Sequence, residues 1–244
     1  MTDKTEFAEK IALALTKNGL GAFSSDMICQ KLFALTERML TVNEYMNLTA
    51  ICDIDGVVVK HYADSLTVAK YIPEGASLID VGCGAGFPSL PLAIARPDLN
   101  ITALDSTAKR INYIRETADM LGLTNITAIA ARAEEAAHDA EHREKYDIAC
   151  ARAVARLNVL SELCMGFVKR GGHFVAMKAN AKDELCEAEV AIKKLGGKLI
   201  LADEFPLISL SRDEEPRCIV SVEKTEPTPK NHPRNNSQIK KKPL

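Results

Sequence analysis

Apolar residues recur every three or four positions along the first third of the chain, and this spacing is typical of helices that bury one face. From Thr5 to about Lys70 no run shows the strict alternation of a strand. The clearest helical series comprises Leu32, Leu35, Met39 and Val42. We expect its helix to begin beside Ser25 or Asp26 and to end at Asn47, because Asn tolerates the turn conformation of a helix exit.

Beyond Pro73 the pattern changes to short apolar runs separated by helical segments, which is typical of βαβ units and a mainly parallel sheet. The predicted strands are Ser77–Val81, Asn100–Leu104, Ile126–Ala130, Asp147–Ala151, Gly172–Met177, Gly197–Phe205 and Arg217–Val222. The last two are joined by PLISLSRDEEP, which holds no long helix. We therefore predict an antiparallel hairpin whose final strand lies at an edge of the sheet.

The composition narrows the class of protein. The 244 residues are 47% hydrophobic and 26% charged, which are globular proportions. No run approaches the roughly 18 apolar residues of a membrane-spanning helix, and the first residues lack the pattern of a signal peptide. The seven cysteines form no CxxC pair and suggest neither a disulfide framework nor a metal site. We expect a soluble, cytoplasmic protein with reduced, mostly buried cysteines.

Charge is distributed unevenly along the chain. The net charge is −2, but residues 224–244 carry +5, so the rest carries −7. Four prolines after Glu226, among Lys, Asn and Ser, argue against a packed structure there. The predicted organisation is a helical N-terminal section at 1–72 packed on the core, an α/β core at 73–224, and a basic, flexible tail at 225–244.

The sharpest local signal is the run LIDVGCGAGF from Leu78 to Phe87, in which a buried strand leads directly into three glycines and a helix. Glycines let the backbone turn tightly and approach a ligand, and the helix start offers free N–H groups. The next strand is followed by Asp105, whose carboxylate can accept hydrogen bonds from both hydroxyls of a ribose. Together these features predict an adenosine-containing cofactor; the alternative is a turn that serves only strand-to-helix packing.

The glycine spacing discriminates between two such cofactors. Nicotinamide dinucleotides are bound by GxGxxG, whereas here Gly82, Gly84 and Gly86 are preceded by Asp80. A carboxylate beside a pyrophosphate would be repelled, but beside the amino group and sulfonium of S-adenosylmethionine it is favourable. The charge argument favours the methyl donor.

Two more positions fit the same pocket. The segment Arg132–Glu135 follows the third strand, where a carboxylate and a backbone N–H can meet the edge of adenine. Surface solvation is the alternative for both glutamates. Phe87 begins the helix beside the glycines, either as a wall of the pocket or as part of the core.

Several blocks extend this signal over nearly the whole chain. They are NLTAI (Asn47–Ile51), KHYADSL (Lys60–Leu66), IDVGCGAGFPSLPLAI (Ile79–Ile94), LDSTAKR (Leu104–Arg110), RAE (Arg132–Glu134), ARA (Ala151–Ala153) and MK (Met177–Lys178). In this order they resemble the blocks of the bacterial small-subunit ribosomal RNA methyltransferase G family, also called glucose-inhibited division protein B. NLT followed by HxxDS and GFPxxPLAI is much more specific than the glycine loop alone.

The resemblance implies a Rossmann-like α/β fold of the class I S-adenosylmethionine-dependent methyltransferases, with a seven-stranded, mostly parallel sheet, helices on both faces and an N-terminal helical extension. It implies methyl transfer from S-adenosylmethionine to N7 of a single guanosine, at about position 527, in 16S ribosomal RNA. The implied partner is 16S ribosomal RNA, the 30S subunit or its precursor. We expect a monomer with no metal, no membrane contact and no obligate protein partner.

The implied site residues fall into two groups. Gly82, Phe87, Ala133, Glu134 and Arg152 match cofactor contacts of the family, and the loop argument adds Gly84 and Asp105. Substrate contacts are expected from Asn47, His61 and Lys178. No catalytic base is assigned, because guanine N7 has a lone pair and no proton to lose.

Individual roles follow from position. Arg152 and Lys178 end the fourth and fifth strands, at the edge where open α/β sheets bind ligands. We favour the cofactor for Arg152 and the RNA for Lys178, with a structural salt bridge as the alternative for each. His61 and Asp64 lie three apart on one helix face, where they either orient each other at the pocket mouth or form a buried structural pair.

RNA affinity depends largely on phosphate neutralisation, so we expect the basic tail to supply much of it, together with Lys109, Arg110 and Arg115. A solvated helix face is the alternative for these three. Other functions stay open at this point: an S-adenosylmethionine-dependent methyltransferase with a small-molecule or protein substrate, a nicotinamide-dependent oxidoreductase, and an RNA-binding module without turnover.

Overall fold

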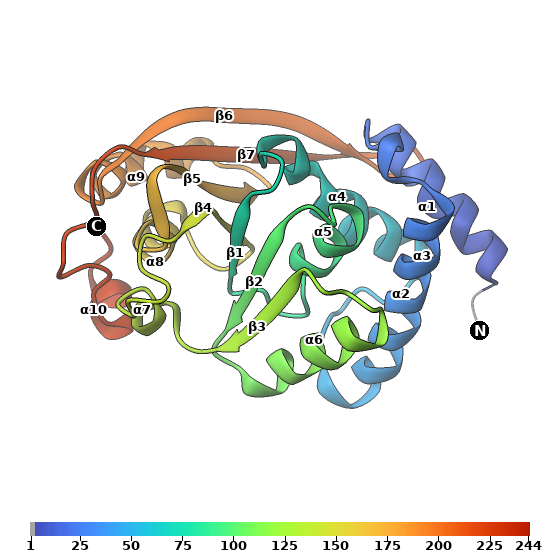
Figure 1. The fold of residues 1–244 in the computed structure, drawn as a ribbon. Helices are drawn as coiled ribbons and strands as arrows, with labels where there is room; N and C mark the ends of the chain where they lie inside the picture. The colour runs from blue at the N-terminus through green and yellow to red at the C-terminus, as the bar shows by residue number, and fades with distance from the viewer. Residues whose placement is uncertain (1–2) are drawn as a thin grey trace.

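The computed structural model describes residues 3–244 and places seven strands in one sheet (Figure 1). The strands are β1 (Ser77–Val81), β2 (Asn100–Asp105), β3 (Ile126–Ala130), β4 (Tyr146–Arg152), β5 (Val168–Lys178), β6 (Gly197–Ile208) and β7 (Glu214–Lys224). Their order is β3-β2-β1-β4-β5-β7-β6, in which β1 to β5 are parallel and β7 runs antiparallel to β5 and β6. The predicted class of fold is confirmed, and each predicted strand lies within an observed one.

The position of the last strand differs from the prediction. β6 and β7 form the expected antiparallel hairpin, but β7 inserts between β5 and β6, so β6 is the edge. The reason lies in the apolar run Cys218–Val222, whose residues are all buried. β6 is exposed at most of its positions and tolerates the edge, whereas β7 needs neighbours on both sides.

Helices cover both faces of the sheet (Figure 1). They are α1 (Lys4–Lys17), α2 (Asp26–Met46), α5 (Ser89–Ala95), α6 (Ala108–Met120), α7 (Ala133–Ala136), α8 (Leu157–Met165), α9 (Lys182–Lys194) and α10 (Asn236–Lys241), with a short 3-10 turn at Gly21–Phe23. Successive residues of β1 enter different apolar clusters. Leu78 belongs to the cluster that includes residues of α1, α2, α5 and α6, and Ile79 to the one that includes residues of α7, α8 and α9. None of the helices within residues 3–244 is long and apolar enough to cross a membrane.

A single helical stretch from Ile54 to Tyr71 connects α2 to β1 and changes its winding along the way. It consists of α3 (Ile54–Gly56), the π-helical η2 (Val57–Ala63), α4 (Asp64–Leu66) and the 3-10 turn η3 (Thr67–Tyr71). Short π segments inside helices are rare and frequent at functional sites. This one carries Lys60 and His61.

The N-terminal helices share the core of the sheet. Tyr62 is fully buried, and its hydroxyl contacts Thr36 Oγ1 at 2.7 Å and donates to the Leu32 carbonyl at 3.1 Å. These bonds fix η2 against α2. Asn47 ends α2 in the left-handed conformation, with φ of 52°, which confirms the predicted helix exit.

The C-terminal segment, residues 225–244, is docked rather than free, in contrast to the flexible tail expected from its composition. Thr228, His232 and Ile239 are buried, and α10 packs against α8. A composition rich in Pro and Lys lowers the apolar area available, but buried hydrogen bonds and ion pairs compensate for it here. The seven cysteines are free thiols, five of them buried.

Candidate cofactor and substrate pocket

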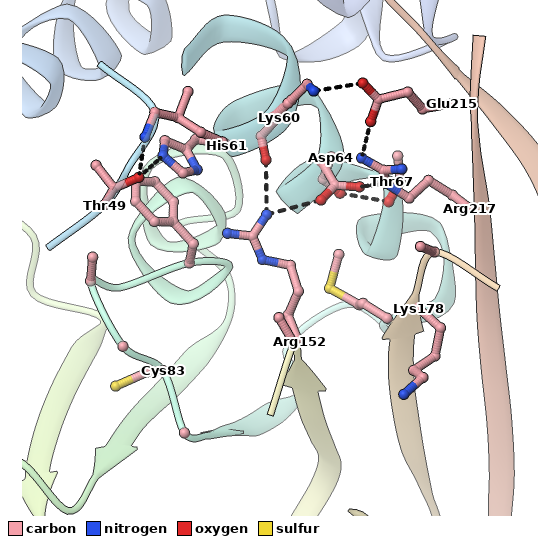
Figure 2. Close-up of a pocket in the computed structure, with 18 of the residues that line it drawn as sticks. Thr49, Lys60, His61, Asp64, Thr67, Cys83, Arg152, Lys178, Glu215 and Arg217 are labelled. Atoms are coloured by element: carbon pink, nitrogen blue, oxygen red, sulfur yellow. Dashed lines mark hydrogen bonds and ion pairs between the residues drawn. The ribbon is translucent and has the colours of Figure 1, made fainter. Parts of the chain in front are cut away.

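A cavity of about 750 Å³ opens at the carboxyl ends of β1, β4 and β5, under the Ile54–Tyr71 stretch (Figure 2). Its lining comes from the loops after these strands, from Leu48 to Ile51, and from the β6–β7 hairpin. The chain leaves β1 toward β2 and β3 and later returns to place β4 on the other side of β1. The cavity therefore lies at the topological switch point, where open α/β sheets bind ligands.

The glycine loop forms one wall of the cavity. Gly82, Gly84 and Gly86 all have positive φ, at 78°, 57° and 88°. A Cβ atom on Gly82 would lie 2.7 Å from Val154 Cγ2, so only glycine fits. At Gly84 a Cβ would meet nothing closer than 4.0 Å, which leaves its backbone open toward a ligand.

Asp105 braces this loop from behind. Its Oδ2 accepts from the Gly84 N–H at 3.1 Å, and its Oδ1 accepts from the Thr107 N–H at 2.8 Å. The carboxylate is nearly buried and lies 3.6 Å from Arg110 Nη1. Arg110 lines the cavity, whereas Asp105 does not.

Asp80 is a buried acid beneath the same loop. Its Oδ2 accepts from Ser89 Oγ at 2.6 Å, while its Oδ1 has no hydrogen-bond partner among the residues that the structure describes. Burial raises the pKa of Asp80 to about 6, although the Ser89 hydrogen bond opposes the shift. Asp80 is fully buried and is absent from the cavity lining, so its carboxylate lies behind the residues that face the cavity.

Phe87, at the end of the glycine loop, contacts both His61 and Arg152. The rings of His61 and Phe87 lie 4.4 Å apart at 9°, and the Arg152 guanidinium lies 5.6 Å from the Phe87 centroid. Burial, reinforced by the charge of Arg152, lowers the pKa of His61 to about 4. The imidazole is therefore neutral at pH 7.

The hydrogen bonds of Thr49 orient this imidazole. Thr49 Oγ1 lies 2.9 Å from His61 Nε2 and accepts from the Ile51 N–H at 3.0 Å. Either Oγ1 or Nε2 can be the donor in this contact, because the threonine hydroxyl has two acceptor lone pairs and one proton. Nδ1 has no partner within residues 3–244.

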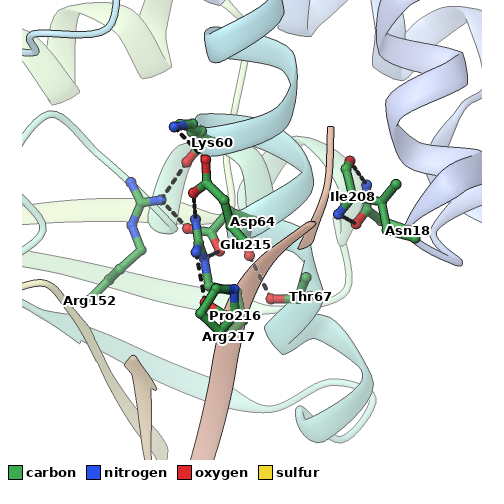
Figure 3. Close-up of polar contacts among 9 residues, drawn as sticks. All are labelled: Asn18, Lys60, Asp64, Thr67, Arg152, Ile208, Glu215, Pro216 and Arg217. Atoms are coloured by element: carbon green, nitrogen blue, oxygen red, sulfur yellow. Dashed lines mark hydrogen bonds and ion pairs between the residues drawn. The ribbon is translucent and has the colours of Figure 1, made fainter. Parts of the chain in front are cut away.

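A chain of ion pairs crosses the top of the cavity (Figure 3). Asp64 Oδ2 accepts from Arg152 Nη1 at 2.9 Å, and Asp64 Oδ1 accepts from Arg217 Nε at 2.8 Å. Arg152 Nη1 also donates to the Lys60 carbonyl at 2.9 Å. Glu215 continues the chain by pairing with Arg217 at 3.2 Å and with Lys60 Nζ at 2.6 Å. The single carboxylate of Asp64 thus fixes two arginines that face the cavity.

The hairpin that supplies Glu215 and Arg217 is itself anchored by α1. The Asn18 side chain donates to the Ile208 carbonyl at 2.9 Å and accepts from the Ile208 N–H at 2.8 Å (Figure 3). Lys17 Nζ donates to the Leu210 carbonyl at 2.6 Å. The N-terminal section therefore helps to hold the far end of the ion-pair chain over the pocket.

Most of the predicted site residues meet at this cavity. Those that line it are Gly82, Gly84, Phe87, Arg152, His61 and Lys178. Lys178 Nζ donates to the Ala155 carbonyl at 2.9 Å and pairs with Glu184 at 2.8 Å. His61 and Asp64 both line the cavity but bind Thr49 and the arginines rather than each other.

Four predicted residues lie outside the lining. Asp105 lies behind the glycine loop, and Ala133 begins α7 next to Glu134, which is 3.8 Å from Arg132. Asn47 is exposed at the end of α2. From that block it is Thr49, two residues on, that reaches the cavity.

Arg217, Glu215 and Thr49 are site residues that the sequence analysis did not identify. Thr49 lies within the NLTAI block, so its position was available as a signal. Arg217 lies 153 residues from Asp64 in sequence, and nothing local distinguishes it from an ordinary strand arginine.

Comparison with known proteins points to one family. Residues 28–205 match the family profile described as rRNA small subunit methyltransferase G. The chain is 39% identical over 241 residues to the ribosomal RNA small subunit methyltransferase G of Lactobacillus acidophilus, covering 97% of this chain and 98% of that protein. It is 48% identical over 205 residues to the protein of the same name from Brevibacillus brevis, covering 83% and 85%.

Solved structures support the fold alone. A SAM-dependent methyltransferase of Methanosarcina mazei superposes with a TM-score of 0.51 at 14% identity, covering 65% of this chain and 97% of that one. M. jannaschii TYW2 in complex with AdoMet gives a TM-score of 0.51 at 18% identity, covering 66% and 76%.

Proposed function

Because the chain belongs to the rRNA small subunit methyltransferase G family, we propose that it transfers a methyl group from S-adenosylmethionine to 16S ribosomal RNA. The acceptor is N7 of a single guanosine, at about position 527, as the family resemblance implies. The observation that carries the proposal is the cavity at the switch point, which combines an open glycine backbone with fixed arginines.

The residues around the cavity fit S-adenosylmethionine. Gly84 leaves its backbone open, and the charge of Asp80, behind the lining, favours an amino group or a sulfonium in the cavity. Arg152 has further guanidinium N–H groups beyond the one that binds Asp64, and these suit a carboxylate. When bound, the cofactor supplies an electrophilic methyl group.

The proposal assigns roles to the predicted residues. For the cofactor they are Gly82, Gly84, Phe87, Asp105, Ala133, Glu134 and Arg152; for the substrate they are Asn47, His61 and Lys178. Asp105, Ala133, Glu134 and Asn47 lie outside the cavity lining, so their roles require a ligand or an RNA that extends beyond it. Asp105 also acts through the Gly84 N–H that it holds.

Guanine N7 has an exposed lone pair, so the protein does not need to remove a proton. Its work is to align the base and to keep donors away from N7. His61 suits this task, because its neutral imidazole lines the cavity and adds no cation beside N7. Lys178 also lines the cavity, and its ammonium group contacts a phosphate or the O6 atom of the guanine.

We propose that the protein acts as a monomer in the cytoplasm, where ribosomal subunits are assembled. The substrate is the 30S subunit or its precursor.

The test is transfer of labelled methyl from S-adenosylmethionine to 30S subunits from a strain that lacks this gene, with the modified base mapped by N7-specific cleavage and reverse transcription. A single cut at one guanosine is expected. Tight binding of the methyl donor without label in RNA would overturn the ribosomal assignment in favour of a small-molecule or protein substrate. Binding of NADH in its place would indicate an oxidoreductase, and RNA binding without either would indicate a binding module.

A further inference from the structure

The C-terminal segment, residues 225–244, is tied down at its base by a buried lysine. Lys224 ends β7, is fully buried, and donates from Nζ to the Met165 carbonyl at 2.7 Å. It also pairs with Glu144 at 3.0 Å and contacts Thr228 Oγ1. The Thr228 N–H donates to the same Glu144 carboxylate at 2.7 Å. These contacts fix the first turn of the segment below the sheet.

A second clamp lies in the middle of the segment, around Arg234. Its Nε and Nη2 donate to the two oxygens of Glu162 at 2.8 and 2.6 Å, and its backbone N–H donates to Oε1 at 2.9 Å. Glu162 is fully buried. Arg234 Nη1 also donates to the Lys242 carbonyl at 3.0 Å, so the same guanidinium links Glu162 to the end of α10.

The segment contacts α8 from the last residue of that helix toward the first. Thr228 lies at Met165, the last residue of α8, and Arg234 lies at Glu162. The final carbonyl, that of Leu244, is 3.4 Å from the Asn158 side chain, at the start of α8. The loop that leads into α8 lines the pocket at Ala153. The end of the chain is therefore brought to the pocket side of the molecule.

The docking divides the basic residues of the segment into two classes. Lys224 and Arg234 are used internally and are paired with carboxylates. Lys230, Lys240, Lys241 and Lys242 are exposed, and none of them forms an ion pair within residues 3–244. Three consecutive free cations thus remain on the outer surface, at and just after the end of α10.

We propose that Lys240, Lys241 and Lys242 form a phosphate-binding surface for the ribosomal RNA substrate, held in place by the Arg234–Glu162 clamp. The inference rests on the proposed function and names the part of the protein that grips the RNA backbone. Ammonium groups act as compact charges for phosphate, and an otherwise acidic body needs such a surface to approach a polyanion. The docked position, rather than net charge alone, directs the RNA to the pocket.

The first experiment compares two triple variants with equal loss of charge. K240Q/K241Q/K242Q is expected to weaken binding of 30S subunits about tenfold and to reduce the salt dependence of log K by about 2 to 3, since each phosphate contact contributes roughly 0.7 to 0.9. The control is K193Q/K194Q/K198Q, at the end of α9 and the start of β6, where the lysines are exposed and absent from the ion pairs of the described residues. Equal losses in both variants would overturn the proposal.

The second experiment removes the clamp without changing the net charge. E162Q/R234Q is expected to weaken binding of 30S subunits to the same extent, although all three lysines remain. Hydrogen exchange at the Ile239 amide, which bonds to the Asn235 carbonyl, reports whether α10 has detached. Unchanged affinity with α10 detached, or α10 still protected, would overturn the role of the clamp.

A third readout separates this proposal from the proposed function. S-adenosylmethionine affinity and methyl transfer at saturating 30S subunit should be unchanged in both triple variants and in E162Q/R234Q. Absence of methyl transfer by the unaltered protein would contradict the proposed function. An equal loss of 30S affinity in the two triple variants would contradict only the surface proposed here.

Discussion

Asp64 and Glu162 are buried carboxylates that bind arginine, and the two ion pairs have different roles. Asp64 is shared by Arg152 and Arg217, and both guanidinia line an open cavity. Glu162 is bound by Arg234 alone, through both oxygens, in a site covered by the C-terminal segment. The arginines that bind Asp64 keep further N–H groups that can bind a ligand, whereas both oxygens of Glu162 accept hydrogen bonds from Arg234. The comparison teaches that a buried ion pair can either prepare a site or fasten a segment, depending on which donors are left over.

The largest effect is expected from Asp64→Asn. The substitution removes the charge that fixes two arginines, so we expect the kcat/KM for methyl transfer to fall about 100-fold or more. Glu215→Gln is the matched control, because Glu215 is half exposed at the outer end of the same series of ion pairs. Its replacement should lower kcat/KM by less than about tenfold. Equal losses in the two variants would remove the distinction between the inner and outer pairs.

Arg234→Leu tests the other carboxylate. It leaves Glu162 buried without its partner, so the free energy of unfolding at pH 7 should fall by about 3 kcal/mol, while S-adenosylmethionine affinity is unchanged. Arg156→Leu is the control, since its partner Glu187 is half exposed, and it should cost less than about 1 kcal/mol. Denaturant unfolding measures both.

The pH dependence of the same variant sharpens this test. Burial raises the pKa of Glu162, but the bonds from Arg234 outweigh it and the net shift is downward. A lowered carboxyl pKa contributes stability that is present above the unfolded value of 4.5 and is lost as the pH falls below it. The difference between the protein and Arg234→Leu should therefore shrink in acid; a constant difference would contradict the ionic origin.

A smaller effect is expected from His61→Asn. The folded pKa of about 4 lies below the ordinary 6.5, so the unfolded chain binds the proton first as the pH falls. The stability contribution is complete above pH 6.5 and is lost toward pH 4, by on the order of 2 kcal/mol. Unfolding measured at pH 7 and pH 4.5 should show a weaker pH dependence in the variant. An identical dependence would mean that His61 protonates freely in the fold.

The smallest expected effect concerns two residues with positive φ. Ala153 at 56° lines the cavity, and Arg212 at 76° lies in the β6–β7 hairpin. Replacement of either by glycine should raise the free energy of unfolding by about 0.5 kcal/mol, because the left-handed conformation disfavours side chains. Only Ala153→Gly should also weaken S-adenosylmethionine binding, measured by calorimetry. A loss of affinity in Arg212→Gly as well would show that the strain at Ala153 has no local role.

The parts of the fold that sequence predicts well are those specified locally. The strand Ser77–Val81 and its glycine loop are marked by an apolar run and by residues whose backbone requires glycine, and both are found as expected. The end of α2 at Asn47 follows from the conformational freedom of Asn. Such features are determined by sequence patterns that span about ten residues.

The features that sequence does not reveal depend on residues far apart along the chain. Arg217 binds Asp64 only because β7 inserts beside β5, which the hairpin pattern alone does not specify. The C-terminal segment has the composition of a disordered tail, yet Glu162 and Lys224 hold it through buried polar contacts. The composition of a segment reports its apolar content, but it does not report buried polar contacts with residues elsewhere in the chain.

The π-helical segment η2 has a consequence for how the pocket tolerates insertions and deletions. A π turn contains one residue more than an α turn, and each residue advances an α-helix by about 100°. Removing one residue from Val57–Val59 would restore a regular helix, yet it would rotate the side chains before the deletion relative to His61 and Asp64 after it. The extra residue thus sets the rotation of one part of the helix relative to the next. With it, the buried valines face the core while Lys60 and His61 face the cavity.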